Sequence, residues 1–232
     1  MKIDKNIHYD IVNLFKEEKK VGFIDEVGRG SIAGDFYSCC VVMNKDWYDK
    51  DINDSKQIKK EVMCQLADKI KENVFNCTLG IVTVEEINTL KNLDVVTALS
   101  FQRSIHFNHD KKPDIIYIDG QKNKYFSSAL SNSLGKDIIS KQVNWVVHGD
   151  SKVFGIACAS VMAKCARDIY MKALHLKLPY YGWNTNAGYR CKKHWEGIHK
   201  HGASEYHRMY LIEKFINDNY YRTIKNTTKD IL

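Results

Sequence analysis

Four acidic residues stand at, or just beyond, the ends of apolar runs in the sequence. Asp25 and Glu26 close the run VGFIDE, Asp119 closes IIYID, and Asp150 follows QVNWVVHG. A carboxylate beside a buried strand is costly unless it is paired or bound to a metal. Carboxylates that converge from several strands bind hard cations such as Mg²⁺ and Mn²⁺. Two such ions about 4 Å apart can activate water and stabilise the leaving oxygen in phosphodiester cleavage.

Structural roles are also open to two of these positions. Asp119 precedes a glycine and fits a turn, because Asp-Gly is a common turn dipeptide. Asp150 fits the N-cap of a following helix, with Ser151 as a rival cap. The adjacent pair Asp25 and Glu26 gains nothing as a turn and favours the metal-site hypothesis most clearly. The sequence offers no Ser–His–Asp set as a source of a protein nucleophile.

The elements that must position these acids alternate between strand-like and helix-like patterns, which predicts a mixed α/β domain. We expect one sheet with helices packed on it and a helical tail from Trp195 onward. Small residues along one side of the last long helix should let it pack closely against the sheet. The expected strands cover 21–26, 36–43, 74–83, the run ending at Asp119, and 142–148; the expected helices cover 7–19, 58–73, 93–108 and 153–177.

Composition limits the class of protein. The chain has 232 residues, of which 44% are hydrophobic, enough for a core in one or two domains. No run of 18 apolar residues predicts a membrane span, and the first residues do not read as a signal peptide. Seven scattered cysteines without a CxxC pair predict reduced thiols in a cytoplasmic setting and no zinc site. The net charge of +7 fits an anionic partner such as nucleic acid.

Five blocks in a fixed order resemble the type 2 ribonucleases H (ribonuclease HII). They are GFIDEVGRGSIAG, NDSKQI, IIYIDG, HGDSKVFGIACASVMAKCARD and NAGYRCKKHWEGIHKHGASEYHR, and together they span residues 22–208. The resemblance implies an RNase H-like mixed β-sheet flanked by helices, with a helical C-terminal extension. It implies a single catalytic domain over 1–232, with a core over about 1–175 and a substrate-binding extension over about 176–232.

The resemblance also implies roles for the acids. Asp25 and Glu26 match the first two acids of the family's metal site, Asp119 the third and Asp150 the fourth. Asp168, in the triplet ARD, is a rival for the fourth role, and we interpret it as structural because it lies well inside a predicted helix.

Four further residues match the parts that choose the substrate. Gly28, Arg29 and Gly30 resemble the loop that senses a ribose 2′-hydroxyl, the group that distinguishes RNA from DNA. Glycines there let the backbone approach a sugar closely. Arg29 fits either a phosphate contact or a brace for the loop. Tyr189 resembles the family's junction tyrosine, whose ring stacks on a deoxyribose; a core or surface role is the alternative.

Basic residues and one serine supply candidate phosphate contacts. Lys56, Ser151, Lys152 and Lys164 are the candidates nearest the matched motifs, and solvated side chains are the alternative for each lysine. A basic surface for the duplex backbone, or equally a solvated helix face, is predicted by Arg190, Lys192, Lys193, His194, His199, Lys200 and His201.

Two positions depart from the family pattern. Ser31 and Asp35 stand where relatives usually carry prolines, and losing each proline should loosen the loop by roughly 0.4–1 kcal/mol at most. Asp35 adds a negative charge near the phosphate track, so we expect altered binding strength and an unchanged metal site. Arg29 and the short N-terminus favour type 2 over the sister type 3 enzymes.

The implied activity is that of an endoribonuclease. It would hydrolyse the RNA strand of RNA–DNA hybrids and cut 5′ of ribonucleotides embedded in duplex DNA, leaving 3′-hydroxyl and 5′-phosphate ends. Water would be the nucleophile, with two Mg²⁺ or Mn²⁺ ions as cofactors. We expect a cytoplasmic monomer with no membrane partner. The alternatives are another RNase H-like nuclease without a 2′-hydroxyl sensor, and a hybrid-binding protein with weak or no catalysis.

Overall fold

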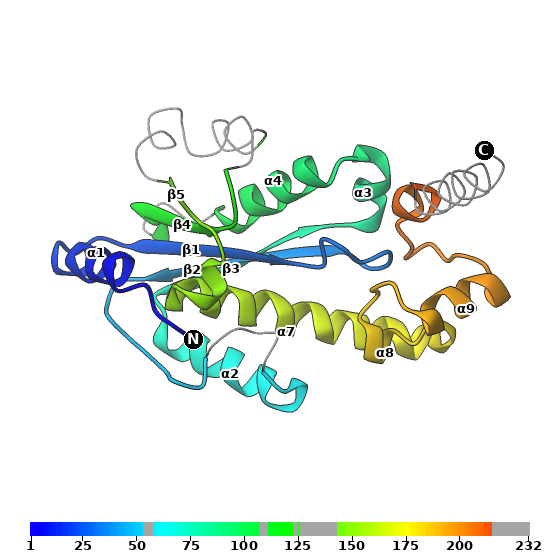
Figure 1. The fold of residues 1–232 in the computed structure, drawn as a ribbon, viewed down its shortest axis with the longest axis horizontal. Helices are drawn as coiled ribbons and strands as arrows, with labels where there is room; N and C mark the ends of the chain where they lie inside the picture. Colours follow the sequence, from blue (N-terminus) through cyan, green and yellow to red (C-terminus); the bar gives the residue numbers. More distant parts are fainter. Residues whose placement is uncertain (53–57, 107–110, 123–124, 126–142, 215–232) are drawn as a thin grey trace, which may run out of the picture.

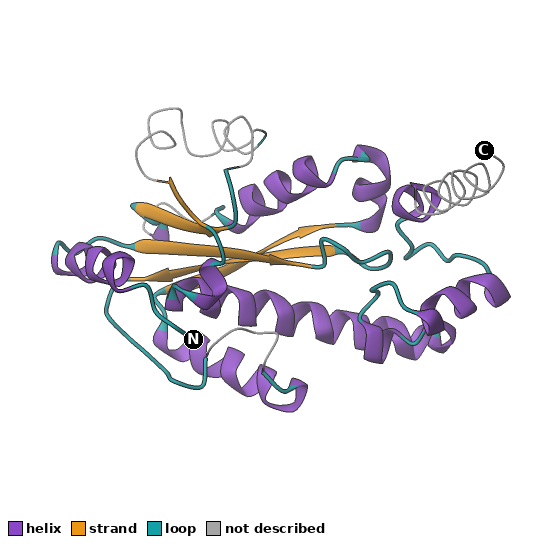
Figure 2. Ribbon diagram, viewed as in Figure 1, coloured by secondary structure: helices purple, strands orange, loops and turns teal. Residues whose placement is uncertain are grey.

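A mixed sheet lies at the centre of the computed structural model, which describes residues 1–52, 58–106, 111–122, 125 and 143–214 (Figures 1 and 2). Within the described residues its strand order is β3-β2-β1-β4-β5. β2 pairs antiparallel with β1 and β3, while β4 is parallel to both β1 and β5. The strands are β1 Val21–Val27, β2 Phe36–Met43, β3 Asn76–Val82, β4 Ile115–Asp119 and β5 Val143–Val146.

Helices cover both faces of this sheet. Figure 1 shows α7 running along one face with α2 against it, and α3 and α4 on the other face. The helices are α1 Lys5–Lys16, α2 Lys60–Asn73, α3 Val84–Leu90, α4 Leu93–Ser104, α7 Phe154–Lys177, α8 Trp183–Asn186 and α9 Lys192–His201, with 3₁₀ turns η2 Gly149–Ser151 and η3 Pro179–Tyr181. No helix in the described ranges is long and apolar enough to cross a membrane.

The alternation of side chains along β1 divides the core into two layers. Val21 and Phe23 belong to the buried cluster on the α7 side, whereas Ile24 belongs to the cluster shared with α4. Successive residues of a strand point to opposite faces, so the two acids that follow inherit this alternation. Asp25 therefore faces α7, and Glu26 faces α4.

Small residues bring α7 close to the sheet, as its sequence predicts. Ala157, Ala159 and Ala163 are fully buried. A Cβ atom added to Gly155 would come within 2.3 Å of the ring of Phe23 on β1. A larger side chain at this position would push the helix away from the strand that carries Asp25.

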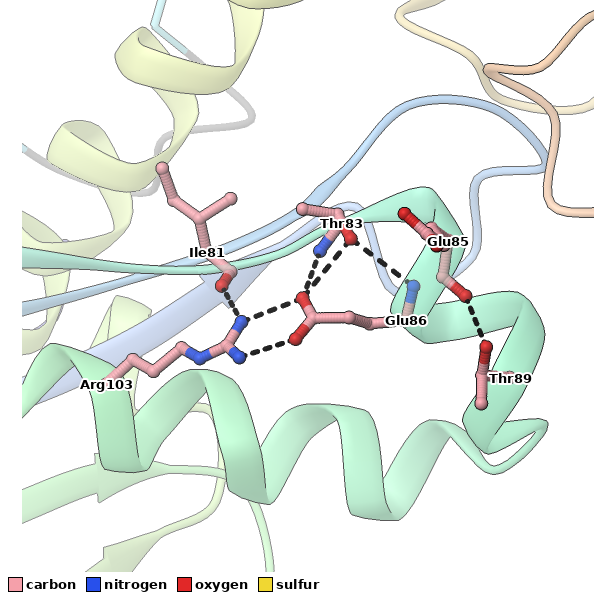
Figure 3. A network of polar contacts seen from close by, with 6 residues as sticks. All are labelled: Ile81, Thr83, Glu85, Glu86, Thr89 and Arg103. Carbon is pink, nitrogen blue, oxygen red and sulfur yellow. Dashed lines mark hydrogen bonds and ion pairs between the residues drawn. The ribbon is translucent and has the colours of Figure 1, made fainter.

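A polar network joins the end of β3 to α3 and α4 (Figure 3). Thr83 caps α3 and forms a capping box with Glu86. Arg103 of α4 donates to both carboxylate oxygens of Glu86, at 2.9 and 2.5 Å, and to the carbonyl oxygen of Ile81 at 2.5 Å. This network fixes the position of α4, whose N-terminal turn contacts the candidate site.

Most predicted elements are confirmed, with differences at their ends. The predicted strand over 36–43 is found unchanged, and the helix predicted over 93–108 ends at Ser104. The strand predicted over 142–148 ends at Val146, because His148 takes a left-handed conformation (φ 56°) that begins η2. The helix α3 was not predicted, since the expected strand over 74–83 ends at its cap. The division near residue 175 stays a prediction; α7 crosses that position without a break.

Candidate active site

Two adjacent parallel strands bring three of the four acids together. Ile24 of β1 pairs with Ile118 of β4, so Asp25 and Asp119 follow this pair on neighbouring strands. Asp25 is 5% exposed and hydrogen-bonds to Ser160 of α7. Its Oδ1 also accepts from the backbone N–H of Glu26 at 2.7 Å. The ends of β1 and β4 thus place carboxylates side by side against α7.

The turn after β5 brings the fourth acid to the same place. The backbone N–H of Gly149 donates to Asp119 Oδ1 at 2.6 Å. A Cβ at Gly149 would lie 2.6 Å from Ile156 Cδ1 and 3.2 Å from Asp119 Oδ1, so only glycine fits the turn without displacement. Asp150 follows at once, is 7% exposed, and lines the cleft that Asp25, Glu26 and Asp119 also line.

Burial and the repulsion between neighbouring carboxylates disfavour the charged forms of Asp25 and Glu26. Burial, then the neighbouring charges of Glu26 and Asp119, raise the pKa of Asp25 well above its usual value. Burial and the charge of Asp119 raise the pKa of Glu26 to about 7, although Arg29 acts in the opposite direction. A divalent cation between such groups would remove the repulsion that raises these pKa values.

The carboxylate oxygens of the four acids are the kind of ligand that a hard divalent cation binds. Four carboxylates on one cleft offer the oxygen ligands that Mg²⁺ and Mn²⁺ take. Their side chains do not form a closed cage: among the residues with described positions, no group of three or more His, Cys, Asp or Glu could hold a metal ion as placed. The residue types and their shared cleft support metal binding, and the coordination itself would require side-chain movement.

Two clefts meet at the acids. Glu26, Arg29 and Asp119 line both of them. The cleft on the α4 side is completed by Asp94, Thr97, Phe101, Gly120, Gln121, Lys122 and Trp145. The cleft on the α7 side has a volume of about 580 Å³ and includes Lys164, Arg167, Asp168, Asn186 and Tyr189. A long substrate strand could therefore pass over the acids from one cleft to the other.

Arg29 braces the loop at residues 28–30, one of the two roles that the sequence left open. Its guanidinium donates to Thr97 Oγ1 at 2.5 Å, Asp94 Oδ1 at 2.5 Å and the carbonyl oxygen of Leu93 at 3.3 Å. These partners belong to the first turns of α4. The loop is thereby tied to the helix that forms one wall of the site.

Comparison with known proteins identifies the family. The family model described as Ribonuclease HII matches residues 22–216, which is most of the chain. A relative named Ribonuclease HII from Bacteroides thetaiotaomicron is 37% identical over 186 residues, covering 80% of this chain and 86% of the relative. The chain belongs to the ribonuclease HII family. It is therefore a metal-dependent nuclease of the hydrolase class, from a family that cleaves the RNA strand of RNA–DNA hybrids.

Solved structures support the same fold. RNase HII from Archaeoglobus fulgidus, solved in complex with PCNA, has a TM-score of 0.65 and 21% identity, covering 83% of this chain and 94% of that one. Bst-RNase HIII, solved in complex with Mn²⁺, has a TM-score of 0.65 and 19% identity, covering 84% of this chain and 65% of that one. At these identities the likeness establishes the RNase H-like architecture alone.

Two buried arginines, which the sequence did not single out, hold the loop over residues 28–35. Arg167 of α7 donates to the carbonyl oxygens of Asp35 (3.0 Å), Ala33 (3.0 Å) and Ala187 (2.8 Å) and to the hydroxyl of Ser31 (2.9 Å). Gly28 has φ 90°, and a Cβ there would lie 2.4 Å from Arg167 Nε. Burial lowers the pKa of Arg167.

Arg208 approaches the same loop from the C-terminal segment. It is fully buried and donates to the carbonyl oxygens of Gly28 at 2.6 Å, Ser31 at 3.1 Å and Gly34 at 2.8 Å. Burial, followed by the charge of Arg167, lowers its pKa to about 9. The only sequence signal for either arginine was its place inside a matched block, in ARD and in YHR.

Tyr189 lies beside the 28–30 loop, and its role at a junction stays a prediction. Its side chain is 40% exposed, and its Cε1 lies 3.8 Å from the place a Cβ of Gly30 would take. The guanidinium carbon of Arg167 is 5.7 Å from the ring centroid. The backbone of Tyr189 is held as well, because His194 Nδ1 lies 2.9 Å from its carbonyl oxygen.

The two departures from the family pattern have partners in the structure. Ser31 is fully buried; its hydroxyl donates to the carbonyl oxygen of Gly28 at 2.9 Å and accepts from Arg167 at 2.9 Å. Asp35 accepts from the backbone N–H of Val84, at the start of α3, at 2.9 Å. Burial raises the pKa of Asp35. These bonds hold both residues in place, and whether the loop is looser without the two prolines stays a prediction.

The predicted phosphate contacts lie at different places relative to the acids. Lys164 lines the α7-side cleft, whereas Lys56 lies outside the described residues. The hydroxyl of Ser151 donates to the carbonyl oxygen of His148 at 2.9 Å, and Lys152 Nζ donates to that of Val147 at 2.7 Å. Lys152 lines a separate small cavity beside α1. Of these four residues, the structure brings Lys164 to the acids.

The predicted basic surface was wrong for one residue. His194 is fully buried within α9, and burial lowers its pKa, so it cannot act as a surface cation. The other members lie on exposed parts of the C-terminal segment, including Arg190, Lys192, Lys193 and Lys200. Asp168, interpreted as structural, lies partly exposed on the wall of the α7-side cleft.

Proposed function

We propose that the chain hydrolyses the RNA strand of RNA–DNA hybrids and also cuts 5′ of ribonucleotides embedded in duplex DNA. The observation that carries this proposal is the meeting, in one cleft, of four carboxylates with the 28–30 loop and Tyr189. The carboxylates supply the cleavage chemistry, and the loop and tyrosine supply the choice of sugar. The products would carry 3′-hydroxyl and 5′-phosphate ends.

The choice of sugar follows from what the two parts present to a bound strand. The loop offers backbone groups to a ribose 2′-hydroxyl, which is both a donor and an acceptor. Tyr189 offers the face of a partly exposed ring, which favours a deoxyribose without a hydroxyl. Because the ring lies next to Gly30, the two parts would contact successive nucleotides at an RNA–DNA junction.

Asp25, Glu26, Asp119 and Asp150 would hold two Mg²⁺ or Mn²⁺ ions, and Bst-RNase HIII, a protein of like fold, has been solved in complex with Mn²⁺. When bound, such ions activate a water molecule and stabilise the leaving 3′ oxygen. The chain itself orients the carboxylates, through Ser160 for Asp25 and the Gly149 N–H for Asp119. Lys164 is placed to contact a phosphate in the α7-side cleft.

Replacing Asp119 by asparagine tests the role of the acids. Asp119→Asn keeps the shape of the side chain but removes a charged ligand. It should lower turnover by roughly a hundredfold or more, the scale on which loss of one charge-stabilising group acts, while the protein still binds a hybrid. Cleavage should be measured with Mg²⁺ and with Mn²⁺ on a long hybrid, a duplex with a single ribonucleotide and an all-DNA duplex.

Asp168→Asn is the matched control, because it removes a charge from the same cleft at a residue assigned a structural role. It should keep most of the activity. Full activity of Asp119→Asn would contradict the metal site. Cleavage of the all-DNA duplex would instead indicate an RNase H-like nuclease without a sugar sensor, and binding without cleavage in the unaltered protein would indicate a hybrid-binding protein.

A further inference from the structure

Two cysteine sulfurs lie in contact on the side of α7 that faces α2. Cys165 Sγ is 2.8 Å from Cys64 Sγ. This separation is closer than the ordinary contact of two nonbonded sulfurs, and a disulfide requires about 2.05 Å. The two residues are 101 positions apart in the sequence, so no local turn accounts for their meeting.

The packing of α2 on α7 holds the two thiols in this position. Met63, Leu66 and Ile70 of α2 are buried in the cluster that includes the α7 side chains. Cys64 follows Met63 at the edge of this interface and is partly exposed, whereas Cys165 is 7% exposed. Cys64 is therefore the more accessible residue of the pair, and the sulfur of Cys165 lies in contact with its sulfur.

The environment of the sulfurs determines which of them reacts first. Burial, then the contact with Cys64, raises the pKa of Cys165 to about 12. A thiol is reactive only as its thiolate, so Cys165 is a poor first nucleophile. Cys39, Cys40 and Cys158 are fully buried and out of reach of an oxidant in solution. Cys77 packs on the same cluster and is partly exposed, and burial raises the pKa of its thiol. Of the contacting pair, Cys64 is thus the sulfur that reacts first with an oxidant.

We propose that Cys64 and Cys165 form a reversible intramolecular disulfide that crosslinks α2 to α7 when the protein meets a peroxide. The Cys64 thiolate attacks one oxygen of hydrogen peroxide, the O–O bond breaks, and Cys64 becomes a sulfenic acid as hydroxide leaves. The sulfur of Cys165 then attacks the sulfur of Cys64 and displaces its hydroxyl group. Overall, two thiols and one peroxide give one disulfide and two water molecules.

The crosslink stabilises the fold without entering the active site. Ser160, Lys164 and Arg167 project from α7 toward the acids and the loop, while Cys165 faces α2. The disulfide closes a long loop, which restricts the unfolded chain. Oxidation should therefore raise the midpoint of thermal unfolding by roughly 4–10 °C and leave hybrid cleavage nearly unchanged.

Thiol counting and peptide mapping test the proposal on the full chain. The reduced protein has seven thiols by sequence, and treatment with hydrogen peroxide should leave five that react in denaturant, seven less the two in the disulfide. Mapping under non-reducing conditions should recover one linked peptide pair that contains residues 64 and 165. Dithiothreitol should restore all seven thiols and reverse the shift in the unfolding midpoint.

Cys64→Ser and Cys165→Ser should each abolish the linked peptide and the shift. Cys191→Ser is the matched control, because Cys191 is also partly exposed but lies on another face, and it should keep both effects. If Cys165→Ser does not fold, Cys64→Ser decides the question. Seven free thiols after treatment, a different cysteine pair, or a sulfinic acid on Cys64 in place of the disulfide would overturn the proposal.

Discussion

A single hydroxyl joins the 28–30 loop to the buried guanidinium of Arg167. Ser31 both donates to the carbonyl oxygen of Gly28 and accepts from Arg167, and it is fully buried. A proline at this position would supply rigidity but neither bond, and it would also remove the backbone N–H that donates to Gly28 at 3.3 Å. In this chain, hydrogen bonds of Ser31 therefore hold the loop at this position.

Ser31→Ala should destabilise the protein by about 1 kcal/mol, the usual net value of a buried hydrogen bond. It should also lower cleavage at a single ribonucleotide more than cleavage of a long hybrid, if the loop contacts the sugar as we propose. Urea unfolding and the ratio of the two rates are the measurements. Ser151→Ala removes a partly exposed hydroxyl that donates to His148, and it should stay within about 0.5 kcal/mol. Equal effects of both variants would contradict the role of Ser31.

At the residue scale, the sequence predicted the four acids better than it predicted the buried arginines that hold the loop beside them. Adjacent carboxylates at the end of an apolar run are unusual enough to be noticed, and the structure places Asp25, Glu26, Asp119 and Asp150 on one cleft. Arg167 was missed because arginine is almost never fully buried, so its type predicts a surface position. Only the assembled loop, with several carbonyl oxygens directed inward, makes burial of the guanidinium favourable.

At the scale of elements, α3 is the main omission. Its signal was present in the sequence TVEE, since Thr83 and Glu86 have the spacing of a capping box. The helix is short, and the strand predicted over 74–83 included its N-cap residue Thr83. Figure 3 shows that Glu86 also binds Arg103, a contact between two elements that local sequence patterns cannot predict.

The pair Glu86–Arg103 gives α3 a pH-dependent stability. The hydrogen bonds from Arg103 lower the pKa of Glu86 to about 2, from an ordinary value of 4.5. Because the folded pKa lies below the unfolded one, the stabilisation is present above about pH 4.5 and is lost as the pH falls toward 2. The side chain of Glu86 is 34% exposed, so solvent screening reduces the effect to about 1 kcal/mol.

Glu86→Gln should therefore be less stable than the unaltered protein at pH 7, with the difference shrinking as the pH falls below 4. Urea unfolding at several pH values measures the free energy of unfolding of both proteins. Subtracting one from the other cancels the titration of the other acids, which the two proteins share. Glu85→Gln is the control, because Glu85 is exposed and its side chain points away from Arg103 in Figure 3. A difference that does not change with pH would show that the ion pair is not the cause.

At the scale of the whole molecule, the C-terminal segment closes back on the N-terminal loop. Ala33 forms a β-bridge with His207, and the N–H of Ile32 donates to the carbonyl oxygen of Gly188 at 2.9 Å. Arg208 completes the contact from the same segment. The sequence suggested a helical extension, but contacts between residues more than 150 positions apart leave no periodic signal. This extension forms a wall of the site and holds Tyr189.

Two buried histidines connect this wall to Tyr189 through a directed chain of hydrogen bonds. Trp183 Nε1 donates to His194 Nε2 at 3.0 Å, so the other nitrogen of His194 carries the proton and donates to the carbonyl oxygen of Tyr189. The N–H of Ser204 donates to His207 Nδ1 at 2.9 Å, which leaves His207 Nε2–H to face His194 at 3.2 Å. In this arrangement both rings are neutral: a further proton on His194 Nε2 would face the N–H of Trp183, and one on His207 Nδ1 would face the N–H of Ser204.

Acidification should therefore loosen this wall first. Burial, then the neighbouring His194, lowers the pKa of His207 to about 4, below the ordinary 6.5. The neutral ring stabilises the fold fully above about pH 6.5, and the contribution falls between pH 6.5 and 4 by up to about 1.4 kcal/mol per pH unit.

His207→Asn should be less stable than the unaltered protein at pH 7.5 and should lose less stability on going to pH 5.5. His199→Asn, on the exposed side of α9, should follow the unaltered protein in urea unfolding at both pH values. If His207→Asn keeps the full pH dependence, the histidine pair is not its source.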